Sequence, residues 1–334
     1  MGTYQFYNYS INENGIVRAY GTNPVDYQTD VLAQKATDFI SNQMSSSKPF
    51  FMWVTPLAPH IARQSFYGDN PEPAPRHNGT FANLALPQPP SFNEADMTDK
   101  PAFMQEHQLL DANAVTAATN LYRDRRETLL GVDDMVEKIV NALRDAGKLD
   151  NTIIIYTSDN GYFHGEHRRY NNKYLVYEES IRVPLIIRGP TVPQNQTRGQ
   201  MVTNLDVVAT IVDLAKTPPG RTLDGHSLNS LFFASAEPWR SAFLVQGADQ
   251  SGLNPKIFHG RYQAVRTPTH VYVEHTTGEQ ELYDLVTDPY EMQSVHDNPA
   301  YAVVENKLKQ ILTMLRTCSG TTCWYTGDVL ATPT

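Results

Sequence analysis

Over the first 215 residues, segments with the hydrophobic period of a helix alternate with short apolar runs, and this alternation constrains the fold more than any other feature. The helical periods cover residues 28–44, 104–146 and 205–215, and the apolar runs lie at 49–57, 153–156 and 181–188. Helices that alternate with buried strands are typical of a parallel sheet covered by helices. The sequence therefore predicts an α/β domain, which we extend to residue 235.

Single residues predict where these elements begin and where they are interrupted. Thr29 or Asp30 can cap the first helix and Asn204 the last, since such side chains accept hydrogen bonds from the free N–H groups of a helix start. Pro184 cannot donate to a strand ladder, so it predicts an edge or a bulge in the third apolar run. Residues 61–100 show no period and predict a long surface loop.

Beyond about residue 240 the pattern changes to short apolar runs with turn signals between them. The runs are AFLVQG, YQAVRT, HVYVEH and ELYDL, and a helical period at 302–315 follows them. Such runs favour a small antiparallel sheet. Residues 236–334 are therefore predicted to form a second, smaller α+β domain.

Charge and hydropathy exclude some classes of partner. The chain has 334 residues, 40% of them hydrophobic, and a net charge of −9. An acidic chain without a basic patch argues against nucleic-acid binding. A membrane-spanning helix needs about 18 consecutive apolar residues, and no such run occurs.

Two sequence features suit an exported protein. The only cysteines, Cys318 and Cys323, flank SGTT, which predicts a small disulfide loop, with two free thiols as the alternative. Asn8, Asn78 and Asn195 each begin an N-x-S/T sequon and are glycosylation candidates. We therefore expect an extracellular, secretory or lysosomal location, or the periplasm of a bacterium.

The stretch IIIYTSDNGYFHGEH, residues 153–167, joins a buried strand to a cluster of polar side chains. Asp159 and Asn160 follow the strand end, where sites of open α/β sheets lie, and they offer two hard oxygen donors. Such donors suit Ca²⁺ or Mg²⁺ better than Zn²⁺. Gly161 permits a tight turn there. An Asx-turn without a metal is the alternative interpretation.

Other polar residues near the expected strand ends are ambiguous when each is taken alone. His164 and His167 lack the spacing of a helical zinc motif, and Lys173 could be a solvated surface charge. His60 closes its own apolar run. If His60 and Lys173 converge with Asp159 and Asn160, the four residues form an oxygen-ligated cation site beside an imidazole and an ammonium. Such a site binds a tetrahedral oxyanion ester and stabilises charge on its leaving group.

Four stretches, in order along the chain, resemble the sulfatases of the alkaline-phosphatase-like superfamily, in particular N-acetylglucosamine-6-sulfatase and arylsulfatase-like members. They are PFFMWVTPLAPH, LLGVDDMVEKIVNALRDAGKLDNTIIIYTSDNGYFHGEH, NKYLVYEESIRVPLIIRGP and ELYDLVTDPYEMQSV. The resemblance implies an α/β sheet sandwiched by helices, with a small C-terminal antiparallel sheet and helix. It further implies Ca²⁺-dependent hydrolysis of sulfated sugars or aryl sulfates.

The resemblance also implies roles for matching positions. Asp159 and Asn160 correspond to two ligands of the active-site Ca²⁺. His60 corresponds to a histidine that contacts the sulfate, and Lys173 to a lysine that contacts the sulfate and steadies the leaving oxygen. His167 lies in a loop that faces the site in related members, which makes it a third candidate for substrate binding.

The chain departs from the family pattern at its nucleophile. Members use a formylglycine made from Cys or Ser in a C/S-x-P-x-R motif, and no such motif occurs here. The N-terminal Asp pair of the Ca²⁺ shell is also missing, so the chain resembles the family from partway into the catalytic domain. We therefore expect little turnover by this chain alone and a missing N-terminal segment as a possible partner.

Two alternatives to a sulfatase remain open from the sequence. One is a phosphodiesterase or phosphonate hydrolase of the same superfamily, although such relatives often carry His at the position of Asn160. The other is a non-catalytic protein that binds sulfated glycans.

Overall fold

The computed structural model describes residues 4–62, 70–233, 238–247 and 261–329, and it divides the chain into two compact units. The first unit comprises residues 1–87 and 111–154, and the second comprises residues 88–110 and 155–334. Each unit is described by itself. The predicted domain boundary between residues 235 and 236 lies outside the described residues and stays a prediction.

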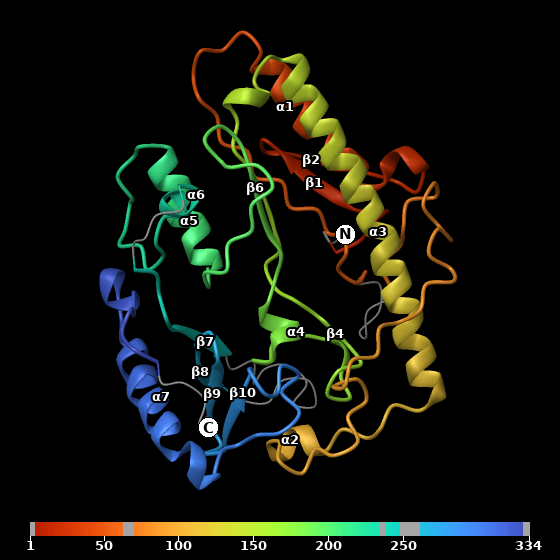
Figure 1. Ribbon diagram of the computed structural model, residues 1–334. Coiled ribbons are helices and arrows are strands. Elements are labelled where there is room, and N and C mark those ends of the chain that lie inside the picture. The colour runs from red at the N-terminus through yellow and green to blue at the C-terminus, as the bar shows by residue number, and fades with distance from the viewer. Residues whose placement is uncertain (1–3, 63–69, 234–237, 248–260, 330–334) are drawn as a thin grey trace. The chain divides into compact units, whose positions relative to one another are not determined.

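The first unit is built on two helices that pack against each other, α1 (Gln28–Asn42) and α3 (Ala112–Asp145) (Figure 1). Its core includes Phe6, Tyr27, Val132 and Met135, all buried. A hairpin of β1 (Ser10–Glu13) and β2 (Ile16–Ala19) precedes the helices.

The second unit contains the remaining sheets and helices. Strands β3 (Ile154–Thr157) and β6 (Leu185–Arg188) pair with each other, and β4 (Phe163–His164) pairs antiparallel with β5 (Tyr170–Asn172). The α-helices that precede the C-terminal sheet in this unit are α2 (Ala102–Gln105), α4 (Glu178–Ile181), α5 (Asn204–Leu214) and α6 (Asn229–Phe232).

The predicted C-terminal antiparallel sheet is confirmed, with strand order β10-β9-β8-β7. Its strands are β7 (Phe243–Gly247), β8 (Tyr262–Arg266), β9 (His270–His275) and β10 (Gln280–Asp284). Helix α7 (Ala302–Leu315) covers it and buries Leu308, Ile311 and Leu312 against Val265 and Tyr272 (Figure 1). The apolar stripe of the helix thereby fixes one face of the sheet.

The predicted buried strand at residues 49–57 is wrong. This segment pairs with no other strand in the described part of the chain, and Phe51 and Trp53 are 64% and 81% exposed. Only Val54 and Leu57 pack against the first core. An apolar run supplies the side chains of a strand but not the neighbouring backbone that completes a ladder.

The predicted helix boundaries need three further corrections. Residues 104–146 form two helices, because Asp111 accepts a hydrogen bond from Ala114 N–H and begins α3 there. Tyr27, not Thr29 or Asp30, is the N-cap of α1. Thr203 rather than Asn204 is the N-cap of α5, where it forms a capping box with Asp206.

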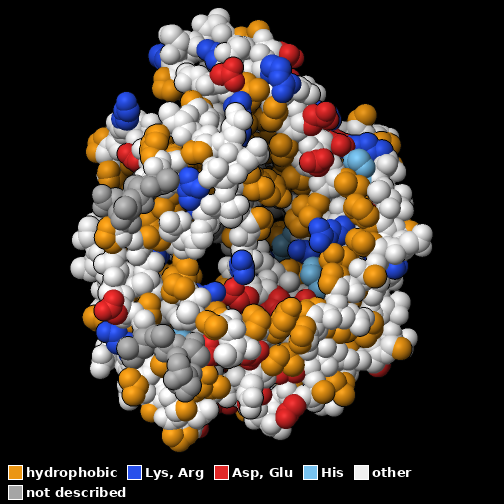
Figure 2. Space-filling model, viewed as in Figure 1, with side chains coloured by type: hydrophobic (Ala, Val, Ile, Leu, Met, Phe, Trp, Pro, Cys, Tyr) orange, Lys and Arg blue, Asp and Glu red, His pale blue; other side chains and the backbone are white. Residues whose placement is uncertain are grey.

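Surface charge is mixed on the face of the molecule drawn in Figure 2. Lysine and arginine side chains lie among acidic, apolar and uncharged ones there. None of the helices that the structure describes is both long and apolar enough to cross a membrane.

Candidate functional site

The loop that carries Asp159 and Asn160 follows β3, and side chains that donate to its backbone carbonyls hold it in place. Ser158 Oγ donates to the Asn160 carbonyl at 2.9 Å. Asn204 Nδ2 donates to the carbonyls of Ser158 and Asp159, at 3.2 and 3.3 Å. Asn204 is thus not the cap of its helix but a support for this loop. The strand therefore delivers the two predicted ligands to a fixed position.

Helix α4 closes the other side of the same loop. Gly161 N–H donates to the Ser180 carbonyl at 2.8 Å, and Tyr162 N–H donates to the Glu179 carbonyl at 2.7 Å. A Cβ atom on Gly161 would lie 2.0 Å from the Glu179 carbonyl oxygen. Only glycine permits this approach of the two backbones, which explains the glycine in the DNG motif.

Lys173 and Asn160, 13 residues apart in sequence, are brought together. The Lys173 ammonium donates to Asn160 Oδ1 at 2.9 Å, and both side chains are partly buried. Lys173 Nζ also lies 5.6 Å from the ring centroid of Tyr174. An ammonium is therefore held against Asn160, one of the two oxygen donors that the sequence singled out.

The backbone around Lys173 is unusual. Tyr174 has a φ of +81° and is 45% exposed, and Asn171 has a φ of +59°. A positive φ is costly for a bulky residue such as tyrosine, and such strain concentrates at functional sites. The strain lies in the segment that positions the ammonium.

The donor set of this loop fits calcium in type. The Asp159 carboxylate is exposed and open to a cation, and the Asn160 amide offers a second hard oxygen that it shares with Lys173. Calcium takes about six to eight oxygen ligands, so these two residues would provide a minority of the shell.

His60, the remaining predicted sulfate contact, belongs to the first unit. Its Nδ1 lies 2.8 Å from the Ile61 carbonyl oxygen, and its ring meets the ring of Tyr4 edge-on at 5.1 Å between centroids. The ring is partly buried. These contacts leave its role in substrate binding a prediction.

His167 is fully buried, in contrast to the loop residues above. Its Nδ1 lies 2.7 Å from Glu94 Oε2, and its ring stacks on Tyr177 at 4.3 Å between centroids. Its backbone N–H donates to the Ser91 carbonyl at 2.7 Å. With no exposed surface, His167 is badly placed for the direct contact with substrate that the sequence suggested.

The charged residues around His167 are held equally firmly. Glu166 Oε2 accepts a hydrogen bond from His164 N–H at 2.6 Å, and burial raises the pKa of this carboxyl. Burial lowers the pKa of Arg169 to about 10. Arg168 donates to the carbonyls of Glu94, Ala95 and His107. The GEHRR segment is therefore held in place by hydrogen bonds to residues 91–107.

Three acidic residues close to His167 were not singled out by the sequence analysis: Glu94, Glu179 and Glu291. Glu94 lies in the long unpatterned loop, Glu179 in the YEES segment and Glu291 in DPYE. The one feature that could have drawn attention to these residues is an acidic side chain in an otherwise apolar or turn-forming segment. Nothing in their local spacing connects them with His167.

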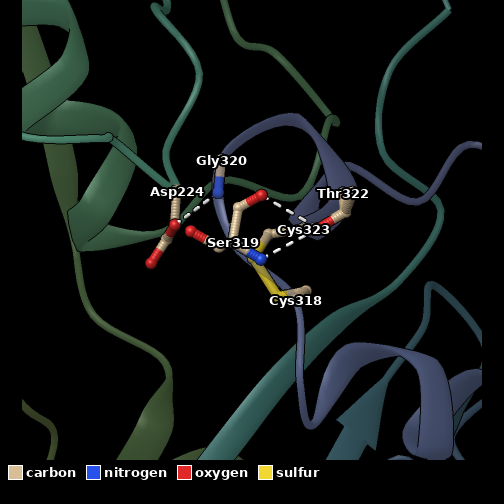
Figure 3. The surroundings of a disulfide bond; sticks show 6 residues. All are labelled: Asp224, Cys318, Ser319, Gly320, Thr322 and Cys323. Carbon is tan, nitrogen blue, oxygen red and sulfur yellow. Dashed lines mark hydrogen bonds between the residues drawn. A yellow bond between two sulfur atoms is a disulfide. The ribbon is translucent and has the colours of Figure 1, made fainter.

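The predicted disulfide between Cys318 and Cys323 is present (Figure 3). The small loop that it closes is tied to the rest of the unit, because Asp224 accepts a hydrogen bond from Gly320 N–H at 2.7 Å. Asn8, Asn78 and Asn195 are exposed and therefore accessible for glycosylation. Glycosylation at these positions stays a prediction.

Comparison with protein families identifies two matches. Residues 1–217 match the family model described as Sulfatase. Residues 165–318 match the model described as N-sulphoglucosamine sulphohydrolase, C-terminal.

Curated relatives cover nearly the whole chain. An N-acetylglucosamine-6-sulfatase of Capra hircus is 34% identical over 349 residues, which cover 96% of this chain and 61% of the relative. An arylsulfatase of Volvox carteri is 32% identical and covers 97% of this chain and 56% of the relative. The chain thus spans about three fifths of the length of these relatives.

Solved structures confirm the predicted fold class. A structure described as a complex with its substrate D-glucosamine-2-N,6-O-disulfate superposes with a TM-score of 0.80 at 26% identity, covering 92% of this chain and 72% of that one. A phosphonate monoester hydrolase of Agrobacterium radiobacter gives a TM-score of 0.69 at 23% identity, covering 89% of this chain and 62% of that one. The second likeness concerns the fold alone.

Proposed function

The chain belongs to the sulfatase family, and on that premise we propose that it serves the hydrolysis of sulfate esters on sulfated sugars, with aryl sulfates as a second substrate class. The observation that carries the proposal is the contact of 2.9 Å between Lys173 Nζ and the side-chain oxygen of Asn160, which follows Asp159 in the chain. The relatives named N-acetylglucosamine-6-sulfatase, and the structure with D-glucosamine-2-N,6-O-disulfate, favour a sulfated amino sugar.

Each residue of the loop has a distinct task in this proposal. The Lys173 ammonium donates to a sulfate oxygen or to the ester oxygen that leaves, and thereby stabilises the negative charge that grows there. Asp159 and Asn160 contribute oxygen ligands to calcium, which when bound neutralises charge on the sulfate. His60 is the proposed second donor to the sulfate.

His167 is assigned no contact with substrate, because its ring is buried against Tyr177 and Glu94. We infer instead that it supports the loop through Glu179, since His167 Nε2 lies 3.9 Å from Glu179 Oε2 and the Glu179 carbonyl accepts a hydrogen bond from Tyr162 N–H.

We further propose that these 334 residues alone do not turn over sulfate esters. A formylglycine nucleophile needs Cys or Ser in a C/S-x-P-x-R motif, and the sequence contains none. Recognition of the sulfate and cleavage of its ester are therefore separable in this chain.

An exported location fits the proposal. The Cys318–Cys323 disulfide is typical of an oxidising compartment. Relatives from Caenorhabditis elegans and Drosophila melanogaster carry the description extracellular sulfatase. Glycopeptide mapping at Asn8, Asn78 and Asn195 in protein from a secreting host tests this location.

Titration calorimetry with glucosamine 6-sulfate, with and without Ca²⁺, tests the function. We expect Ca²⁺-dependent binding that weakens at least about tenfold in Lys173→Met, since a charge-assisted contact with an anion is lost. Lys307→Met on α7 is the matched control and should bind normally.

Three outcomes would contradict parts of the proposal. Equal binding by the Lys173→Met variant removes the assigned role of the ammonium. Turnover of 4-nitrophenyl sulfate by the purified chain overturns the prediction of inactivity. Preferential binding of a phosphonate monoester over glucosamine 6-sulfate would favour the phosphonate hydrolase alternative.

A further inference from the structure

Three side chains of the second unit, two of them buried and that of Glu179 half-buried, each point one polar atom at a common centre. They are His167, between β4 and β5, Glu179 on α4, and Glu291, which follows β10. Their Nε2 and carboxylate oxygens all lie within 4.8 Å of one another, and His167 Nε2 lies 3.9 Å from Glu179 Oε2. Segments more than 100 residues apart in sequence thus converge on this point.

Each of the three side chains is anchored through its other polar atom. Glu179 Oε1 accepts from Ser91 Oγ at 3.2 Å, and Glu291 Oε2 accepts from Glu178 N–H at 2.8 Å. The atoms that face the centre, His167 Nε2, Glu179 Oε2 and Glu291 Oε1, are buried and have no hydrogen-bond partner among the described residues. The side chains are therefore held in place while one ligand atom of each stays available.

The contact with Glu94 fixes which nitrogen of His167 can bind a cation. A carboxylate only accepts hydrogen bonds, so Nδ1 carries the proton that is shared with Glu94 Oε2 at 2.7 Å. In the neutral ring, Nε2 then carries the free lone pair. A histidine that donates to a carboxylate through one nitrogen is the arrangement that metal ligands in proteins adopt.

The charge balance of the cluster also calls for a cation. Lys100 Nζ lies 3.3 Å from Glu94 Oε1 and balances that carboxylate. Within the part of the chain that the structure describes, Glu179 and Glu291 form no ion pair with a lysine or an arginine. Glu291 is only 1% exposed. Burying carboxylates without a compensating charge is costly.

We propose that His167 Nε2, Glu179 Oε2 and Glu291 Oε1 bind a divalent transition metal of the Zn²⁺ type. One imidazole nitrogen and two carboxylate oxygens form a mixed donor set that Zn²⁺ accepts, with a water molecule as fourth ligand. Tetrahedral ligands of Zn²⁺ lie about 3.4 Å apart, so the separation of 3.9 Å has to close by about half an ångström. This site is separate from the oxygen donors Asp159 and Asn160.

The cation would brace the loop of the proposed active site. Glu179 is a ligand through its side chain, and its carbonyl accepts the Tyr162 N–H, three residues after Asp159. The neighbouring Ser180 carbonyl accepts Gly161 N–H. A metal on Glu179 therefore ties α4, and with it the DNG turn, to His167 and Glu291.

The test measures metal content and thermal stability of the purified chain after removal of metals with a chelator. We expect the stripped chain to take up about one equivalent of Zn²⁺ per chain, with a rise in Tm, because binding to the folded state alone stabilises it. Co²⁺ in place of Zn²⁺ should give the visible absorption of a site with nitrogen and oxygen ligands.

Matched variants assign the ligands. His167→Gln and Glu291→Gln should bind Zn²⁺ at least about a hundredfold more weakly. His275→Gln is the control, since His275 is also buried and also contacts a glutamate, at 2.7 Å, but faces no acidic pair. Asp159→Asn should keep its Zn²⁺, which separates this site from the proposed calcium ligands. Circular dichroism of each stripped variant checks that it folds.

Three results would overturn the proposal. In the first, the stripped chain takes up no Zn²⁺ and its Tm does not rise when Zn²⁺ is added. In the second, His167→Gln or Glu291→Gln binds Zn²⁺ as tightly as the unaltered chain, and in the third only Asp159→Asn abolishes the uptake. The first result would mean that the cluster holds a shared proton instead of a metal. None of these outcomes depends on sulfate binding, so the metal site and the proposed function fail independently.

Discussion

Tyr177 joins two buried clusters of the second unit that use the same residue types in opposite ways. Its hydroxyl donates to Glu281 Oε2 at 2.8 Å, and its ring stacks on His167. Glu281 also accepts from His275 Nε2 at 2.7 Å, and His167 shares a proton with Glu94 at the same distance. The two histidine–glutamate pairs are thus alike in geometry and burial.

The clusters differ in what surrounds each pair. Glu281 receives hydrogen bonds from His275, Tyr177 and Tyr283, so its charge is stabilised by three donors. The carboxylates of Glu179 and Glu291 each keep an oxygen without a donor among the described residues. A buried carboxylate with a full set of donors holds the fold together, whereas one without is suited to a ligand.

Replacement of Glu281 should have the largest effect on stability. Glu281→Ala leaves a buried histidine and two tyrosine hydroxyls without their acceptor, so we expect a loss of about 3–5 kcal/mol in the free energy of unfolding. Urea denaturation of the purified chain measures it. A loss below about 1 kcal/mol would show that the cluster relaxes and that the three bonds contribute little.

Tyr177→Phe separates the hydroxyl of Tyr177 from its ring. The variant loses the hydrogen bond to Glu281 but keeps an aromatic ring over His167, so we expect a loss of about 1.5–3 kcal/mol. Zn²⁺ uptake should be unchanged, because the phenyl ring still packs on the imidazole. Loss of Zn²⁺ uptake together with stability would show that the two clusters cannot be treated separately.

Acidification should weaken the cluster of His275, Tyr177 and Tyr283 around Glu281. Burial opposes the charge of Glu281, but the hydrogen bonds from His275 and the tyrosines outweigh it and hold the pKa below its ordinary value of 4.5. With a pKa lower in the folded than in the unfolded chain, this stabilisation is present above about pH 4.5 and is lost as the pH falls through the lower pKa.

The groups that face Glu281 are His275, Tyr177, Tyr283 and, through space, Tyr262. Glu281→Gln should therefore be less stable than the unaltered chain at pH 7, and the difference should narrow below about pH 4.5. Urea midpoints at pH 3 to 7 follow it. A difference that stays constant over this range would contradict the assigned role of the charge.

The same contrast explains what could be predicted from the sequence. Local signals located α1, α7, β3 and the four C-terminal strands, because each has an apolar period of its own. The Asn14-Gly15 pair, with φ of 53° and 96°, marks the β1–β2 hairpin, and this signal was overlooked. Residues 49–57 had the composition of a strand but no ladder partner in the described chain.

The residues of the candidate site also fall into those with a local sequence signal and those without one. Asp159, Asn160 and Lys173 could be singled out because a strand end and a family resemblance mark them, and the structure joins Lys173 to Asn160. Glu94, Glu179 and Glu291 lie in three separate segments, and only the folded chain brings them to His167. Single-sequence patterns carry no information on such long-range pairing.

Glu291→Gln should have the smallest effect, and its sign should depend on the metal. In the stripped chain, the amide replaces a buried carboxylate that forms no ion pair with a lysine or arginine of the described residues. We therefore expect a change in the free energy of unfolding within about 1 kcal/mol, in either direction. With Zn²⁺ added, the unaltered chain should gain stability and the variant should not. Urea denaturation with chelator and with Zn²⁺ gives both comparisons. A large loss in the stripped variant would place Glu291 with Glu281, as a carboxylate that holds the fold together, and would remove the distinction between the two clusters.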